Sequence, residues 1–186
     1  LCAAKSIKRL VYASSGGTVY GDSEEKLINE DHPCDPVNSY GITKLATEKY
    51  IRAISREKKM DYAILRISNP YGGFSNPHSP VGLFAKIEQS LTDNTPFELR
   101  VPLETTRDYI PIEDVVEAFL SITDHDEPVF DTFNVSSGHG LSIRQVIKMM
   151  EEKHGKKLII NKVSSGNPEV RCNILDNSKL KRFLSN

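Results

Sequence analysis

The fold is decided by Lys8-Arg-Leu-Val-Tyr-Ala-Ser-Ser-Gly-Gly-Thr-Val-Tyr-Gly21 and, further along, by Tyr40-Gly-Ile-Thr-Lys44. The first stretch reads as a short apolar strand that leads into a turn of small residues. In the second, Tyr40 and Lys44 are four residues apart and would share one face of a helix. A phenol ordinarily loses its proton near pH ~10, and a neighbouring ammonium favours the phenolate. Such a pair can exchange a proton with an alcohol or a carbonyl.

The rest of the chain alternates strand-like and helix-like segments, which favours an α/β architecture. Strands are predicted over 8–14, 61–67, 96–101, 130–135 and 157–163. Helices are predicted over 38–58, 81–92, 113–124, 142–154 and 177–184. The segments 22–37 and 69–80 are rich in Pro, Asn, Asp and Gly and are expected to be loops. Ser142 and Gln145 have capping-box spacing, and Gly155 suits a helix end.

Composition excludes several classes of protein. The 186 residues carry a formal net charge of −1 and 38% hydrophobic residues, without the basic excess of a nucleic-acid binder. No apolar run approaches the ~20 residues of a membrane span, and the first four residues are too short to be a signal peptide. Three isolated cysteines and five scattered histidines indicate neither a disulfide framework nor a metal site. A reducing cytoplasm is the expected compartment.

A resemblance to a known family rests on the order of four motifs, two of which are quoted above. They are Thr18-Val-Tyr-Gly21, the Tyr40/Lys44 pair, Leu65-Arg-Ile-Ser-Asn-Pro-Tyr-Gly72 and Arg107-Asp-Tyr-Ile110. Together they resemble the extended short-chain dehydrogenase/reductases, in particular the UDP-glucose 4-epimerase-like members of the nucleotide-sugar epimerase/dehydratase branch. The resemblance runs from about the first residue to Leu180 and implies NAD as cofactor and a nucleotide sugar, with UDP-hexose expected, as substrate.

The resemblance also implies a fold class. It is an α/β fold with a partial Rossmann-like doubly wound parallel sheet and a smaller α/β substrate-binding region. Residues 1–80 would form the C-terminal part of the NAD-binding domain. Residues 81–186 would mainly bind the nucleotide sugar, with 106–135 returning partly to the Rossmann sheet.

The glycine-rich turn that holds the pyrophosphate in dinucleotide-binding folds is not found in this sequence. The nearest approach is Gly138-His-Gly140, which lacks the third glycine and is interpreted as the lead-in to a helix. We therefore expect the sequence to be the C-terminal part of a longer enzyme, and the 186 residues alone to be inactive.

The expected catalytic residues follow from the resemblance. Tyr40 would exchange the proton, and Lys44 would tune Tyr40 and bond the nicotinamide ribose. Relatives carry a Ser or Thr hydroxyl four residues before the tyrosine of Val-Tyr-Gly, but this chain has Gly16 there. Thr18 or Ser15 would supply the hydroxyl, with Thr18 favoured, although both also suit ordinary turn positions. The other expected cofactor contacts are Ser14, Pro70 and Tyr71.

Four residues are expected at the substrate. Asn69 matches a position that bonds the sugar or its phosphate, although Asn-Pro is also a turn signal. Arg107 matches an arginine that clamps the diphosphate, with a surface ion pair to Asp108 or Glu104 as the alternative. The expected second diphosphate group is Arg171. The helix over 81–92, with Phe84 and Lys86, lies where relatives hold the uracil, although Phe84 also suits a core face.

The resemblance leaves three readings of the function open. Sugar dehydratases have acidic residues where this chain has Gly17 and Thr18, so elimination would lack its general acid and base. An NAD-dependent 4-epimerase, acting by transient oxidation at C4, is favoured over a reductase or dehydrogenase of the same superfamily. The third reading is a non-catalytic binding protein. Relatives form homodimers through the helix that carries the tyrosine, so a homodimer is expected.

Overall fold

The protein is described by a computed structural model that covers residues 7–23, 25, 27–73, 81–164 and 172–185. A parallel sheet is built from β1 (Arg9–Ser15), β2 (Asp61–Ile67) and β6 (Phe130–Val135), in the order β1-β2-β6. Its register places Ser14 beside Arg66, and Arg66 beside Asn134. Most of the β2 side chains are buried, as expected of a parallel strand that is covered on both faces.

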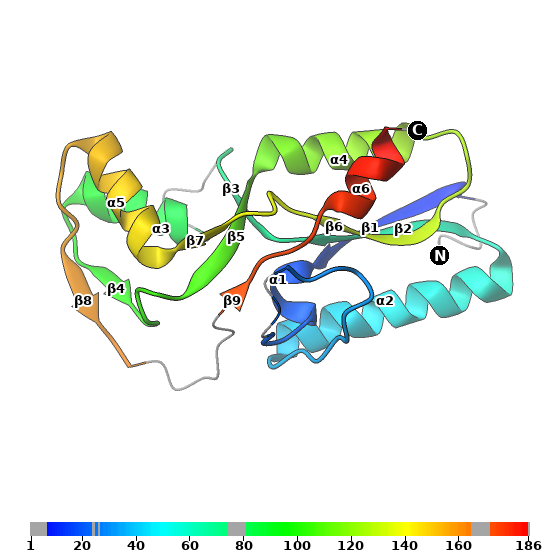
Figure 1. Ribbon diagram of the computed structural model, residues 1–186, viewed down its shortest axis with the longest axis horizontal. Helices are drawn as coiled ribbons and strands as arrows, with labels where there is room; N and C mark the ends of the chain where they lie inside the picture. Colours follow the sequence, from blue (N-terminus) through cyan, green and yellow to red (C-terminus); the bar gives the residue numbers. More distant parts are fainter. Residues whose placement is uncertain (1–6, 24, 26, 74–80, 165–171, 186) are drawn as a thin grey trace.

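Helices cover both faces of this sheet (Figure 1). The long helix α2 (Ser39–Lys58) follows one face, and α4 (Ile112–Asp124) and α6 (Ser178–Leu184) lie on the other. The core on the α4 side includes Leu65, Val115, Ile122 and Phe133. The predicted α/β fold with a parallel Rossmann-like sheet is therefore confirmed.

A second region is built around a smaller mixed sheet. The strand β5 (Thr106–Pro111) pairs with β3 (Asn69–Tyr71), β7 (Gly140–Ser142) and β9 (Cys172–Asn173). Next to it lie the pair β4 (Phe97–Leu99) and β8 (Ile160–Lys162) and the helices α3 (Leu83–Asp93) and α5 (Ile143–His154). This region has its own core, which includes Ile87, Leu91, Val146 and Met150.

Several sequence predictions need correction. Residues 69–71 form a strand and not a loop, because Asn69–Tyr71 pairs in parallel with Tyr109–Pro111. Residues 106–111, for which no strand was predicted, form β5, the strand to which β3, β7 and β9 pair. Gly140 begins the short strand β7, which ends at the N-cap of α5, so the interpretation of Gly138–Gly140 as the lead-in to a helix holds with a strand added.

The predicted helix limits hold where local caps set them. Ser142 and Gln145 form the expected capping box at the start of α5. Gly155 ends the same helix with a left-handed φ of 61°, a conformation that glycine adopts without steric cost. By contrast, the helix predicted over 81–92 begins at Leu83, after Gly82 with a φ of 87°.

Candidate functional site

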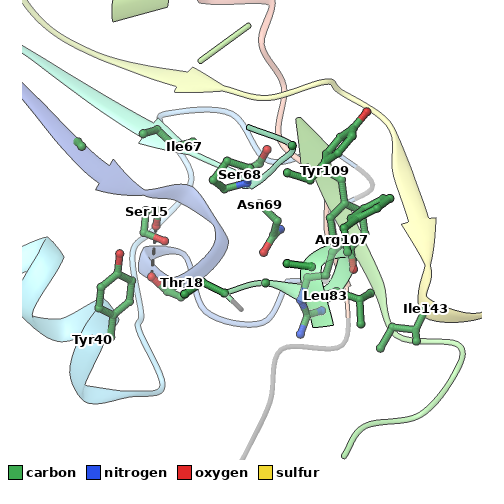
Figure 2. Close-up of a pocket in the computed structure, with 18 of the residues that line it drawn as sticks. Ser15, Thr18, Tyr40, Ile67, Ser68, Asn69, Leu83, Arg107, Tyr109 and Ile143 are labelled. Atoms are coloured by element: carbon green, nitrogen blue, oxygen red, sulfur yellow. Dashed lines mark hydrogen bonds between the residues drawn. The ribbon is translucent and has the colours of Figure 1, made fainter. Parts of the chain in front are cut away.

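A cleft of about 740 Å³ lies where β1 and β2 end and the second region begins. It opens at the carboxyl ends of parallel strands, the usual place for ligands in α/β sheets. Figure 2 shows Ser15, Thr18 and Tyr40 on one side of the cleft and Arg107, Leu83 and Ile143 on the other. The expected site residues that line it are Ser14, Ser15, Thr18, Tyr40, Lys44, Asn69, Pro70, Tyr71, Phe84 and Arg107. Arg171 lies outside the described residues.

The start of α2 brings Tyr40 and Lys44 to the cleft. Asn38 caps the helix, because its side chain accepts a hydrogen bond from the Gly41 amide at 2.9 Å. The Lys44 ammonium lies 5.5 Å from the centre of the Tyr40 ring and donates to the Ala13 carbonyl at 2.8 Å. The tyrosine and lysine therefore share a helix face beside the end of β1, and Tyr40 remains 55% exposed.

Gly41 sets how closely the tyrosine approaches the turn after β1. A Cβ atom at Gly41 would lie 2.7 Å from the Thr18 carbonyl oxygen and 2.8 Å from Pro36 Cβ. Both distances are shorter than non-bonded contacts allow, so only glycine fits at this position without a shift of the backbone. The sequence signal was the glycine directly after the tyrosine, which sequence reasoning left without a role.

The turn after β1 is a short helical turn, α1 (Gly16–Val19), and not an irregular turn. The Thr18 hydroxyl lines the cleft and donates to the Ser15 carbonyl at 3.4 Å, a long bond that leaves its lone pairs available. Gly16, at the position where relatives carry a hydroxyl, is buried beneath the cleft. A Cβ there would overlap Leu175 Cδ1 and lie 3.0 Å from the Arg66 carbonyl oxygen.

The middle of the cleft is formed by the end of β2 and by β3. The Asn69 amide donates to the Asp108 carbonyl at 2.8 Å, and Pro70 follows in the same strand. Gly17 faces Asn69, because a Cβ at Gly17 would lie 3.6 Å from the Asn69 Oδ1 atom. The absent side chain at Gly17 therefore leaves the Asn69 amide open toward the cleft.

An aromatic wall and an arginine form the far end. The Tyr71 and Phe84 rings stack at 4.4 Å, and Tyr109 meets Phe84 edge-on at 5.2 Å. Arg107 follows from β5 and donates to the Thr106 carbonyl at 3.1 Å. The two carboxylates considered as ion-pair partners have other bonds: Glu104 pairs with Arg144, and Asp108 accepts from the backbone amides of Ser137, Gly138 and Leu175.

Sequence reasoning missed a layer of charged residues beneath the cleft. Glu48, on the inner face of α2, accepts hydrogen bonds from Ser14 Oγ at 2.5 Å and Arg66 Nη2 at 2.8 Å. Burial would raise the pKa of the Glu48 carboxyl, but the hydrogen bonds and charge of Arg66 outweigh it and hold the pKa below its ordinary value. The Arg66 guanidinium lies 4.8 Å from the Tyr20 ring centre. Glu48 lies four residues after Lys44 on the same helix, but nothing in the sequence alone distinguishes it from an exposed glutamate.

The cleft is also defined by what does not line it. Among the described residues, none that lines the cleft carries a carboxylate. In the same part of the chain, no group of three or more His, Cys, Asp or Glu side chains could hold a metal ion. None of the described helices is long and apolar enough to cross a bilayer.

Comparison with known proteins gives consistent results. The sequence model of the NAD dependent epimerase/dehydratase family matches residues 1–136. The dTDP-4-dehydro-6-deoxyglucose reductase of Escherichia coli is 36% identical over 153 residues, which are 82% of this chain and 48% of the relative. The chain spans about half the length of the curated relatives it matches.

Solved structures share the fold. The UDP-glucose 4-epimerase of Thermotoga maritima, solved with UDP-glucose, is similar with a TM-score of 0.88 and 28% identity, over 97% of this chain and 58% of that one. The Thermus thermophilus UDP-glucose 4-epimerase in complex with NAD gives a TM-score of 0.89 and 26% identity, over 98% and 60%.

Proposed function

The chain belongs to the NAD-dependent epimerase/dehydratase family, and on that premise we propose that the whole protein is a nucleotide-sugar 4-epimerase that uses NAD. The observation that carries the proposal is the convergence of Tyr40, Lys44 and Thr18 on a cleft that no described carboxylate lines. This set can move a proton at a sugar hydroxyl and lacks the acid and base that elimination needs.

The residues at the β1 side of the cleft fit the nicotinamide end of NAD. Lys44 is fixed there by its bond to the Ala13 carbonyl, and Ser14, Pro70 and Tyr71 line the neighbouring surface. When bound, NAD supplies a hydride acceptor and donor beside the reacting carbon. The protein contributes the position of that carbon and the handling of its proton.

Tyr40 is the proposed acid and base. Its hydroxyl makes no hydrogen bond with any residue that the structure describes, so it is available to a substrate hydroxyl. The Lys44 ammonium lies 5.5 Å from the ring centre, on the same face of α2. Thr18 would hydrogen-bond the reacting oxygen in place of the hydroxyl absent at Gly16, with Ser15 as the second candidate.

The far end of the cleft would hold the nucleotide. Arg107 would bind the diphosphate, since a guanidinium donates two parallel hydrogen bonds to phosphate oxygens. Asn69 would bond the sugar or the phosphate, and Phe84 would contact the base. Arg171 stays a proposed second phosphate ligand.

The experiment is an assay of the whole protein with UDP-glucose and UDP-galactose, with Tyr40→Phe as the control variant. A 4-epimerase interconverts the two sugars without net formation of NADH. Interconversion that the Tyr40→Phe variant carries out at the wild-type rate would contradict the catalytic role of Tyr40. No turnover of any nucleotide sugar would favour the non-catalytic reading.

A second candidate is a 4-keto-sugar reductase. It is favoured by the 36% identity to the E. coli dTDP-4-dehydro-6-deoxyglucose reductase. The same protein would then consume one NADH or NADPH for each keto sugar reduced and would not interconvert UDP-glucose and UDP-galactose. An assay with dTDP-4-dehydro-6-deoxyglucose therefore separates the two candidates.

We also propose that the protein forms a homodimer through the outer face of α2. Tyr50 and Ile54 are exposed on this face, with Tyr50 71% accessible, whereas Ile51 points into the core. Exposed apolar side chains on one helix face favour an interface. Light scattering of the whole protein should give a dimer mass that Tyr50→Glu reduces to that of a monomer. An unchanged mass would contradict this interface.

A further inference from the structure

The segment 172–177 packs against α1, although the two are far apart in the chain. Figure 1 shows β9 between β5 and α1. The segment is fastened to residue 28 by two backbone hydrogen bonds, Ile28 N to Ile174 O and Asp176 N to Ile28 O, each 2.9 Å. Leu175 is fully buried against Val19 and Ile28 and fills the space where a side chain at residue 16 would lie. This segment therefore supplies the buried surface against which α1 packs.

Asn173 makes the polar contact between this segment and the turn. It is fully buried and stands beside Arg107 in the β5–β9 pairing. Its Nδ2 atom donates to the Gly16 carbonyl at 3.1 Å. This side chain thus links β9, which pairs with the strand that carries Arg107, to the first residue of the turn that carries Thr18.

The Oδ1 atom of the Asn173 amide lowers the stability of the folded protein. Among the described residues, its Oδ1 atom is buried without a hydrogen-bond partner. A buried acceptor that has lost water without gaining a donor destabilises the folded state. An apolar side chain of similar size would avoid that cost, so the bond to Gly16 is the contribution that only the amide makes.

We propose that Asn173 is a positioning residue for the hydride-transfer reaction, and this inference rests on the proposed function. Its bond to the Gly16 carbonyl holds α1 in the position that places Thr18 at the cleft that Tyr40 also lines. The start of α2 approaches the same turn closely, because a Cβ atom at Gly41 would lie 2.7 Å from the Thr18 carbonyl oxygen. The turn α1 is thus held both by Asn173 and by the start of α2.

The test compares Asn173→Leu with Asn177→Leu in the whole protein. Asn177 is a matched control, because its Nδ2 atom also donates to a backbone carbonyl, that of Ser136 at 2.7 Å, but not to α1. We expect Asn173→Leu to lower kcat about tenfold while KM for the nucleotide sugar changes less than about twofold. Asn177→Leu should leave kcat within about twofold. A loss of kcat in proportion to lost thermal stability in both variants would overturn the proposal.

A second measurement does not depend on the substrate. Hydrogen exchange of the amides of Val19 and Tyr20, which face the carbonyls four residues earlier in the turn, reports on the local opening of α1. Asn173→Leu should speed this exchange about tenfold, whereas Asn177→Leu should not change it. Unchanged exchange in Asn173→Leu would overturn the proposal even if the protein is an active epimerase. Faster exchange in a protein that acts on no nucleotide sugar would leave the bracing of α1 standing and would overturn the proposed function and the positioning role together.

Discussion

Tyr40 lines the cleft and Tyr20 does not, and the two tyrosines have opposite surroundings. Tyr20 is buried; its hydroxyl donates to Asn134 Oδ1 at 2.7 Å, and burial raises its pKa to about 12 even though Arg66 acts to lower it. Tyr40 is more than half exposed, and its hydroxyl has no partner among the described residues. Two kinds of polar side chain are thus distinguished. Those of a supporting layer are buried and hydrogen-bond one another, whereas those on the surface of the cleft are available to a ligand.

The supporting layer continues from Tyr20 through Arg66 to Glu48 and Ser14, each of which is buried. Three elements, β1, β2 and α2, are tied together by these side chains just below the cleft. A phenol as fully engaged as that of Tyr20 stays protonated and cannot serve as a base at working pH. The position of Tyr40 depends on this supporting layer, because Tyr40 and Glu48 lie on the same helix.

The largest expected effect is that of Tyr40→Phe. Because the variant loses the general acid and base, kcat of the whole protein should fall ~10²–10⁴-fold, while affinity for the nucleotide sugar stays nearly unchanged. Steady-state kinetics and calorimetry measure the two quantities. Tyr20→Phe is the matched control, with about 1 kcal/mol of lost stability and kcat within a few-fold. Equal loss of activity in the two variants would show that the buried Tyr20 and the exposed Tyr40 do not have the separate roles described above.

Next in size is Glu48→Gln. Removal of the carboxylate leaves the buried Arg66 guanidinium unpaired, so unfolding free energy should fall by about 3–5 kcal/mol. Urea unfolding of the whole protein measures this. Glu57→Gln, which breaks an exposed pair with Lys58 on the same helix, should leave stability essentially unchanged.

The same variant tests a pH dependence. Because the folded-state pKa of Glu48 lies below its ordinary value of 4.5, its stabilisation is fully present above that pH and is lost as pH falls through the folded-state pKa. Urea unfolding in acid should show a shallower loss of stability for Glu48→Gln than for the wild type. Parallel pH profiles for the two proteins would argue against a paired carboxylate.

Gly41→Ala should lower kcat about 10²-fold, because the added Cβ pushes α2 away from the Thr18 carbonyl and misplaces Tyr40. Kinetics together with thermal unfolding separates this effect from helix propensity, which alone would stabilise the alanine variant. Thr43→Ala, on the exposed side of the same helix turn, is the control. A more stable Gly41→Ala enzyme with normal kcat would mean that the contact with Thr18 does not position the tyrosine.

The smallest expected effect is that of Arg107→Ala. Loss of charge-assisted hydrogen bonds, about 1.5–3 kcal/mol, should raise KM about 10- to 100-fold and leave bound NAD unchanged. Calorimetry with UDP measures the effect directly. The exposed Arg100, paired with Glu98, provides the control. Equal UDP affinity in Arg107→Ala and wild type would assign the arginine to another role.

Sequence alone predicted the elements whose signal is local. The strands at 61–67 and 130–135 and the helix that begins at Ser39 follow from apolar runs, caps and periodicity. The strand at 106–111 was missed because Arg107 and Asp108 interrupt its apolar pattern. Asp108 is tolerated inside because distant backbone amides bond its carboxylate. Such pairing is fixed only by the fold.

The candidate site was also predicted only where the sequence signal is local. Tyr40, Lys44, Asn69 and Arg107 were predicted from motifs that resemble those of a known family, and all line the cleft. Glu48 and Asn173 were not found, because a buried charge or amide looks like a surface residue until its partner is known. Their partners, Arg66 and Gly16, are 18 and 157 residues away.

The last of these separations has a consequence for folding. Closing a loop of 157 residues costs on the order of 4 kcal/mol of chain entropy, and contacts so distant form slowly. During synthesis, α1 and α2 leave the ribosome long before Asn173 does. The hydrogen bond from Asn173 to the turn therefore forms only after residue 173 has been synthesised, later than the helix and strand that carry the chemistry of the site.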